Sequence, residues 1–309
     1  MAGGAVDVTV VVVTFNSAET LPGFLSSLPD GLDGVASHEL VVTDNGSTDG
    51  TLEVVARLAA GATVFVVGAN RGYAAGINAG IAAARHPSRA VLVANPDVRL
   101  GRGCVERLLR ALHHRPDVGI VVPKLLHRDG SVARTLRREP TVLRAVGEAV
   151  LGGNRAGRVP AFGEVITDPA AYEHPRTVTW ATGALMLISR DCLERVGAWD
   201  ESFFLYSEET DFALRARDAG LVTWYLPDAT ATHLGGDAHR SPQLWALLSR
   251  NRVRLFARRH GRARTTAFRS AVVLNEALRA LAGRATSRAA LRALVGTAGP
   301  TLPGSDARG

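Results

Sequence analysis

Asp97 and His233 have side chains that could bind a metal ion or a phosphate. Asp97 follows a buried apolar segment and is held by Pro96, so its carboxylate is suited to a divalent cation that carries a diphosphate. The alternative for Asp97 is a turn or a helix cap. His233 follows the last expected strand and precedes two glycines, where a backbone can approach a ligand closely. A structural histidine is the alternative there.

A second acidic group opens an expected helix. Glu208, Glu209 and Asp211 fall at the start of this helix, where the helix dipole stabilises negative charge. Residues 209 and 211 point in different directions on a helix, so one can face a cleft as a general base while the other supports the fold. A well-capped helix without a catalytic role is the alternative.

The segments that must position these residues alternate between strands and helices. Apolar, β-branched runs predict strands at 8–14, 39–43, 63–67, 90–94, 119–124, 177–189 and 221–226, and helical spacing predicts helices at 17–28, 51–60, 74–84, 102–113 and 208–219. Residues 134–176 are expected to form loops and one short helix. The alternation predicts an α/β fold with a mostly parallel central sheet flanked by helices. Ligands bind at the carboxyl ends of such strands, where the polar clusters fall.

Several function classes are excluded by what the sequence lacks. Two cysteines, Cys104 and Cys192, cannot make a disulfide scaffold and fit a reducing compartment. The chain has no P-loop, no Rossmann glycine pattern and no nucleophile elbow, and no aromatic platform for nucleic acid. Without a signal-like start or a long apolar run, we expect a cytoplasmic protein, with attachment to the inner face of the cell membrane as an open alternative.

Positive charge is concentrated at the end of the chain. The 309 residues carry a net charge of +7, and residues 240–309 contain 14 arginines against two acidic residues. We expect a domain over 1–239, a basic helical extension over 240–299 and a flexible tail over 300–309. An anionic membrane surface is one expected partner of 240–292, bound by Arg250, Arg254, Arg258 and Arg259 with Leu247, Leu248, Leu255 and Phe256 in the interface. The alternative is that these apolar residues pack on the body of the protein and the arginines face solvent, as a solvated helix face.

The order of the motifs resembles inverting family 2 glycosyltransferases over residues 8–236. The motifs are Val10–Asn16, Asp44–Asp49, Asn70–Gly80, Asn95–Asp97, Thr182–Ala184, Gly197–Phe204, Tyr206–Asp211 and His233. The resemblance implies a GT-A (nucleotide-diphospho-sugar transferase) fold for the catalytic domain over 1–239. It also implies a nucleotide-diphosphate sugar donor and a Mg²⁺ or Mn²⁺ ion.

The resemblance assigns roles to individual residues. Glu209 stands where the family has its catalytic Asp, with Glu208 and Asp211 supporting it. Asp97 and His233 are the implied metal ligands, and Asn95 stands where many members have a further Asp. The implied donor-binding residues are Thr14, Phe15, Asn16, Asp44, Asn70, Arg71, Gly72, Asn78 and Asn95. The implied acceptor-binding residues are Gly183, Ala184, Trp199 and Asp200.

A narrower resemblance is to bacterial rhamnosyltransferases. It lies in Lys124–Ser131, Arg137–Pro140 and Phe203–Asp211. It implies transfer of L-rhamnose from dTDP-rhamnose to a glycan or a polyprenyl-diphosphate-linked acceptor in cell-wall or polysaccharide synthesis. The open alternatives are a UDP-sugar such as UDP-galactofuranose, a soluble acceptor, and a non-catalytic nucleotide-sugar-binding or membrane-associated protein. The sequence indicates neither the acceptor hydroxyl nor the oligomeric state.

Overall fold

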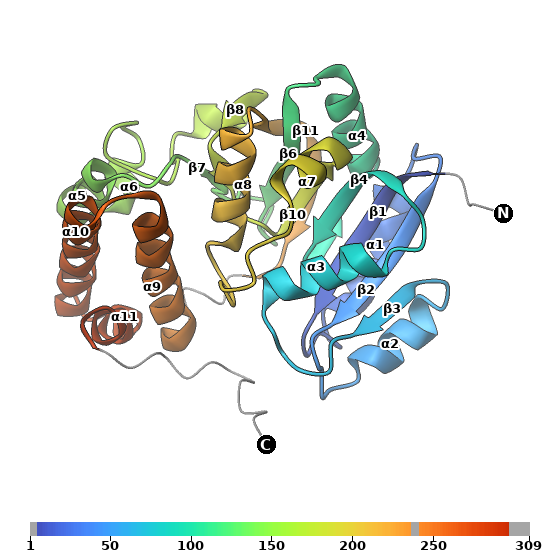
Figure 1. Ribbon diagram of the computed structural model, residues 1–309, viewed down its shortest axis with the longest axis horizontal. Coiled ribbons are helices and arrows are strands. Elements are labelled where there is room, and N and C mark those ends of the chain that lie inside the picture. The colour runs from blue at the N-terminus through green and yellow to red at the C-terminus, as the bar shows by residue number, and fades with distance from the viewer. Residues whose placement is uncertain (1–4, 236–240, 297–309) are drawn as a thin grey trace.

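The computed structural model describes residues 5–235 and 241–296. Figure 1 shows a twisted sheet with covering helices on one side of the molecule and a bundle of helices on the other. The flexible tail expected over 300–309 lies outside the described residues.

The central sheet has the strand order β3-β2-β1-β4-β10-β6-β11-β5, with β8 pairing beside β11. Its strands are β1 (Val6–Thr14), β2 (His38–Asp44), β3 (Thr63–Val66), β4 (Ser88–Ala94), β5 (Val98–Leu100), β6 (Val118–Leu126), β8 (Arg176–Val178), β10 (Leu185–Ser189) and β11 (Val222–His233). Strands β1 to β4 are parallel to one another, as are β6 and β11. Strand β10 runs antiparallel between β4 and β6.

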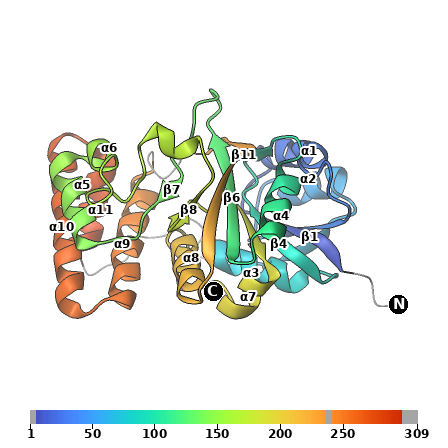
Figure 2. The same cartoon turned by 90° about the horizontal axis from the view of Figure 1, so that it is seen from above.

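Helices cover both faces of this sheet (Figure 2). One face is covered by α1 (Leu21–Gly31), α2 (Thr51–Leu58) and α4 (Cys104–His114), and the other by α3 (Tyr73–Ala83), α7 (Arg190–Val196) and α8 (Glu208–Asp218). Alternate valines of β1 enter the two cores: Val10 packs in one and Val11 in the other. The predicted α/β class is confirmed. A continuous apolar run marks a strand buried on both faces but does not give its direction, which is why the antiparallel β10 was not foreseen.

Residues 134–176 hold more regular structure than the sequence predicts. They contain β7 (Leu136–Arg137), α5 (Val142–Leu151), α6 (Gly153–Ala156) and the 3₁₀ turn η1 (Pro169–Tyr172), and β7 pairs with β9 (Trp180–Ala181). Helix α5 begins where the Thr141 hydroxyl accepts the backbone N–H of Arg144, and it ends at Gly152, whose φ is 74°. The expectation of loops with one short helix is therefore wrong.

The expected C-terminal helices are present as α9 (Pro242–Arg259), α10 (Arg262–Leu281) and α11 (Ala285–Val295). They form a bundle with α5, in which Phe256 stacks on Phe268 with ring centroids 4.0 Å apart. The division of the chain at residue 239 stays a prediction, although α5, from within 1–239, packs in this bundle. No helix within 5–235 or 241–296 is long and apolar enough to cross a membrane.

The bundle corrects one expectation about α9. Leu247, Leu255 and Phe256 are buried, each no more than 7% exposed, so they cannot enter a membrane interface as expected. Leucine and phenylalanine at helical spacing on α9 form its buried side because α10 and α11 pack against it.

Candidate active site

Asp97 and His233 meet at the edge between β5 and β11. Strand β5 pairs antiparallel with β11, which sets Val98 opposite His233. The His233 Nε2 atom lies 3.3 Å from Asp97 Oδ2, and both side chains remain partly exposed. His233 is the last residue of β11, which is longer than predicted, rather than a residue beyond the strand.

The surroundings of this pair fit a divalent cation. A Cβ atom at Gly235 would overlap Asp97 Oδ2, so the glycine keeps the space beside the carboxylate open. Within the described residues, no group of three or more His, Cys, Asp and Glu side chains gathers at one point. Two protein ligands suit an ion such as Mg²⁺ that completes its coordination with water and substrate phosphates.

Glu208 and Glu209 lie at the first turn of α8. Glu209 packs against Gly183, where an added Cβ would lie 3.2 Å from the Glu209 Cβ. Among the described residues, neither Oε2 atom finds a hydrogen-bond partner, although both atoms are buried. Burial raises the pKa of Glu209, opposed by the charge of Arg137. Burial and the charge of Glu209 raise the pKa of Glu208 well above its usual range.

The turn before α8 has a strained backbone. Tyr206 and Ser207 have φ values of 70° and 79°, a region that residues other than glycine rarely occupy. Asn251 of α9 donates its amide to the carbonyl oxygens of Leu205 at 2.9 Å and Tyr206 at 3.2 Å. A residue of the C-terminal helices therefore holds the turn that delivers Glu209. No motif of the sequence singles out Asn251.

Tyr73 connects the two halves of the site. Its hydroxyl donates to the Gly183 carbonyl at 3.2 Å, and its backbone N–H donates to the Phe204 carbonyl at 2.9 Å. Burial raises the pKa of Tyr73, and the negative charges of Glu208, Glu209 and Asp97 raise it further. The phenol thus lies within electrostatic reach of both acidic groups. Its position inside the Asn70–Gly80 motif was the only signal that could have identified it.

The first two donor-binding motifs meet at the ends of β1 and β2. Asp44 is fully buried and accepts the Thr14 hydroxyl at 2.9 Å and the backbone N–H of Ser47 at 2.9 Å. Asn16 is exposed, with φ 48°, and accepts the Thr48 N–H at 2.8 Å. Phe15, between them, is partly exposed. The structure brings all four predicted residues together, with Thr14 and Asp44 shaping the loop.

The other predicted donor-binding residues lie in the loop before α3, on α3 and directly after β4. Asn70 accepts the N–H of Gly72 at 3.1 Å, and Gly72 has φ 93° and contacts the Phe204 backbone so closely that no Cβ fits. Arg71 is exposed. Asn95, directly after β4, donates its N–H to the Ala184 carbonyl at 2.9 Å, which joins a predicted donor-binding residue to a predicted acceptor-binding one.

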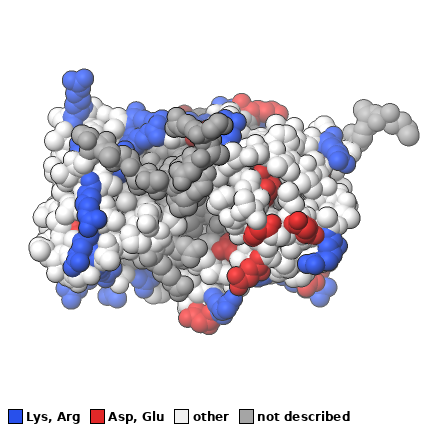
Figure 3. All heavy atoms as spheres, turned by 90° about the horizontal axis from the view of Figure 1, so that it is seen from below, with Lys and Arg blue, Asp and Glu red and all other residues white. Residues whose placement is uncertain are grey.

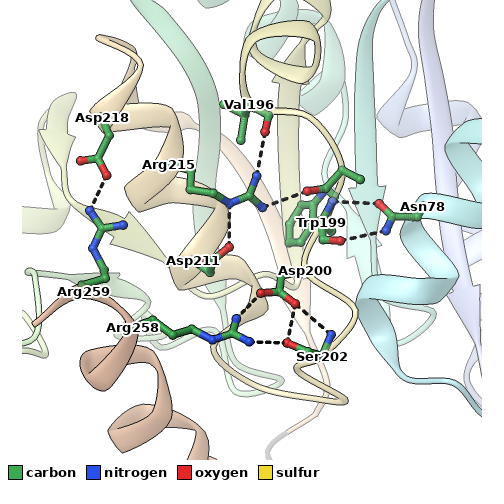
Figure 4. A network of polar contacts seen from close by, with 11 residues as sticks. Asn78, Val196, Trp199, Asp200, Ser202, Asp211, Arg215, Asp218, Arg258 and Arg259 are labelled. Atoms are coloured by element: carbon green, nitrogen blue, oxygen red, sulfur yellow. Dashed lines mark hydrogen bonds and ion pairs between the residues drawn. The ribbon is translucent and has the colours of Figure 1, made fainter. Parts of the chain in front are cut away.

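Three further predicted site residues brace the segment 197–203 (Figure 4). The Asn78 amide accepts the Trp199 N–H and donates to the Trp199 carbonyl, both at 2.9 Å. The Trp199 indole is 2% exposed and stacks on Phe212 with ring centroids 4.5 Å apart. Asp200 binds Ser202 and the guanidinium of Arg258. These contacts support a structural role, and a contact of these residues with donor or acceptor stays a prediction.

Asp211 points away from Glu209, into the same bracing network. Its carboxylate accepts from Arg215 Nε at 2.7 Å, and Arg215 also donates to the carbonyl oxygens of Val196 and Ala198 (Figure 4). The Asp211 side chain thus holds α8 against the segment that precedes Trp199.

The sequence of this chain matches a known protein family. The family model "Glycosyl transferase family 2" matches residues 9–169, more than half of the chain. The chain belongs to glycosyltransferase family 2. It is 33% identical over 235 residues to N-acetylglucosaminyl-diphospho-decaprenol L-rhamnosyltransferase of Mycobacterium tuberculosis, a match that covers 72% of this chain and 75% of that protein. The predicted resemblance to family 2 and to rhamnosyltransferases is confirmed.

Two further comparisons agree with this assignment. The low-salt glycan biosynthesis hexosyltransferase Agl10 of Haloferax volcanii is 29% identical over 216 residues, covering 68% of this chain and 62% of that protein. Among solved structures, the mannosyltransferase PcManGT of Pyrobaculum calidifontis, in complex with GDP-Man and Mn²⁺, superposes with a TM-score of 0.56. It is 20% identical, and the match covers 98% of this chain and 80% of that one. The GT-A fold is confirmed, and the enzyme is a family 2 glycosyltransferase.

Proposed function

We propose that this glycosyltransferase moves L-rhamnose from dTDP-rhamnose to a polyprenyl-diphosphate-linked or glycan acceptor, with inversion at the anomeric carbon. The observation that carries the proposal is the Glu209 carboxylate at the first turn of α8, whose buried Oε2 atom has no hydrogen-bond partner among the described residues. The similarity to the mycobacterial rhamnosyltransferase supports the choice of sugar and acceptor. The alternatives of another class are not favoured, because the family model and the mycobacterial relative are both those of transferases.

Glu209 serves as the general base. Its carboxylate takes the proton of the acceptor hydroxyl while that oxygen bonds to the anomeric carbon and the bond from that carbon to the diphosphate breaks. Because burial raises the pKa of Glu209, its carboxylate is a stronger base than an exposed glutamate. Glu208 and Asp211 support the helix that presents it.

Asp97 and His233 would hold a Mg²⁺ or Mn²⁺ ion beside the donor diphosphate. Such an ion stabilises the negative charge that develops on the departing nucleoside diphosphate. The strand-end residues Thr14–Asn16, Asp44 and Asn70–Gly72 bind the nucleotide, with Asn95 beside the diphosphate. Gly183 and Ala184 border the acceptor. An acceptor carried by a lipid also makes an anionic membrane surface a partner of the enzyme.

The deciding experiment combines nucleotide binding with sugar transfer. Thermal shift with UDP, dTDP, GDP and ADP, each with and without Mg²⁺ or Mn²⁺, is expected to show metal-dependent stabilisation by dTDP. Glu209→Gln should keep this stabilisation and lose turnover by at least about 100-fold. Transfer at near wild-type rate by Glu209→Gln would show that the base is another residue.

The same panel separates the alternatives. Stabilisation by UDP instead of dTDP would favour a UDP-sugar such as UDP-galactofuranose. Transfer to a soluble sugar but not to a lipid-linked acceptor would favour a soluble acceptor. A folded protein that no nucleotide stabilises against thermal unfolding would contradict the proposal and favour the non-catalytic alternative.

A further inference from the structure

The helical bundle exposes a concentration of apolar side chains. Ten of the fourteen large apolar side chains that are exposed in the described residues fall within 143–162 and 274–295. They are Leu143, Val146, Val150 and Leu151 of α5, Val159 and Phe162 after it, Leu274, Leu278 and Leu281 of α10, and Val295 of α11. Single exposed apolar residues need no explanation, but a group of them in one part of a molecule marks a contact surface.

On α5 and α10 these residues form one stripe each. Positions 143, 146 and 150, and positions 274, 278 and 281, are three or four residues apart and so share one face of their helix. The opposite faces are buried in the bundle, where Ala145 and Phe268 pack in one cluster. The two helices lie side by side at the end of the molecule away from β3 (Figures 1 and 2). The stripes therefore face outward.

The exposed charges around these stripes have one sign. Residues 142–163 and 241–296 contain fifteen arginines, of which Arg252, Arg258 and Arg259 bind carboxylates, and only two acidic residues, Glu148 and Glu276. Both acidic side chains are buried, and they bind Arg252 and Trp245 respectively. Figure 3 shows this uneven charge on one face of the molecule: Lys and Arg dominate the bundle, and Asp and Glu gather over the part that contains the central sheet, the sheet half.

We propose that the stripes of α5 and α10, with the arginines around them, dock the protein on an anionic lipid bilayer. Leucine and valine side chains enter the boundary between headgroups and acyl chains, and the guanidinium groups bind lipid phosphates. The proposal rests on the proposed function, in which the acceptor is lipid-linked, because docking holds the enzyme beside that acceptor. A second copy of this chain is less suited than a bilayer as the partner of this surface, because two surfaces of equal positive charge repel each other.

The test is sedimentation of the full chain with lipid vesicles. The protein is expected to bind vesicles of phosphatidylglycerol and phosphatidylcholine, to bind vesicles of phosphatidylcholine alone at least about tenfold more weakly, and to be released by high salt. The double variant Val150→Gln/Leu278→Gln should bind the anionic vesicles about tenfold more weakly than the wild type. Both side chains are exposed, at 69% and 46%, so the substitutions leave the bundle core intact.

Leu58→Gln is the matched control. Leu58 is an apolar helix residue of similar exposure, 49%, on the sheet half, so this variant should bind vesicles like the wild type. The proposal is overturned if the wild type does not bind anionic vesicles at low salt, or if the double variant binds as well as the control. It is also overturned if light scattering shows a dimer that the double variant dissociates, because the surface would then join two copies.

Two further readouts separate this proposal from the proposed function. Nucleotide stabilisation and transfer to a water-soluble, short-chain acceptor should be the same in the double variant and the wild type. Transfer without vesicle binding would overturn only the docking surface. Vesicle binding without transfer to any acceptor would overturn the proposed function and leave the docking surface standing.

Discussion

Glu208 and Glu209 are neighbours in the chain, but their carboxylates have different surroundings. Glu208 is 2% exposed, whereas Glu209 is only partly buried and borders Gly183. Burial raises the pKa of both carboxyl groups, and the adjacent charge raises the pKa of Glu208 further, well above its usual range, so Glu208 is the more readily protonated of the two. Glu209 is therefore the carboxylate of the pair that is able to accept a proton from a substrate.

The pH dependence of the reaction should reflect this difference. Because burial raises the pKa of Glu209, we expect kcat/KM to rise with pH through an apparent pKa above about 4.3, the value of an exposed glutamate. Glu208→Gln replaces a protonated, neutral side chain with another neutral one. The variant should therefore show the same apparent pKa for the rise of kcat/KM with pH. If the apparent pKa of the rise in kcat/KM changes in Glu208→Gln, Glu208 titrates together with the base.

Glu208→Gln should also change stability, with a predictable sign. The pKa of Glu208 is raised in the folded state, so its stabilising contribution is complete below the unfolded pKa and is lost as pH rises through the folded pKa. We expect the variant to be more stable than the wild type at alkaline pH, and the difference to shrink on acidification. Denaturant unfolding at several pH values measures this, and a variant that is less stable at every pH would contradict it.

Gly235 offers a test of the cation site that leaves its ligands unchanged. A methyl group at this position would overlap the Asp97 carboxylate, so Gly235→Ala should raise the Mg²⁺ or Mn²⁺ concentration for half-maximal activity about tenfold or more. Gly61→Ala is the control, because nothing lies within 4 Å of an added Cβ there. An unchanged metal requirement in Gly235→Ala would argue against a cation beside Asp97.

At the scale of elements, α9 holds the turn that precedes Glu209. Asn251 is 5% exposed and donates to two carbonyl groups of the turn that contains Tyr206 and Ser207, whose φ values are positive. Asn251→Asp keeps the size of the side chain but removes the donor. We expect kcat to fall about 10- to 100-fold with little change in nucleotide binding, because the turn relaxes and displaces Glu209.

A control variant distinguishes an effect of Asn251 on the position of Glu209 from a general loss of stability. Asn275→Asp makes the same change on α10 and should leave kcat near the wild-type value. Nucleotide binding measured by thermal shift should be similar in both variants. If Asn251→Asp and Asn275→Asp lose activity in parallel with their melting temperatures, Asn251 has no specific effect on the turn.

The sequence predicts local features well and contacts between distant segments poorly. The apolar, β-branched run of β1 predicts a strand buried on both faces, and the structure confirms it. Helix α5 was missed because its cap, Thr141, and its end, Gly152, lie in a segment rich in Gly, Pro and Arg that resembles a loop. The contact of Asn251 with the turn depends on the docking of α9, 45 residues further along the chain, and no local pattern encodes it.

At the scale of the whole molecule, a buried ion network joins the early and late parts of the chain. Arg252 of α9 binds Glu148 of α5 at 2.8 Å and Glu164 at 2.6 Å. Glu148 also accepts the Glu164 N–H at 2.9 Å. Burial raises the pKa of Glu164, and the charge of Glu148 adds to this, while Arg252 opposes both. Arg252 is therefore the cation that offsets the negative charge of two buried carboxylates in this network.

Removal of this arginine should destabilise the protein as a whole. Arg252→Ala leaves two buried carboxylates without their cation, which we expect to cost about 3–5 kcal/mol in the free energy of unfolding at neutral pH. The loss should shrink as the pH falls, because burial raises the pKa of Glu164 and lets this carboxylate take up a proton. Arg195→Ala, at an exposed ion pair with Asp191, is the control and should have little effect. If instead only the bundle unfolds early and the sheet half melts as in the wild type, the two halves fold independently and the network does not couple them.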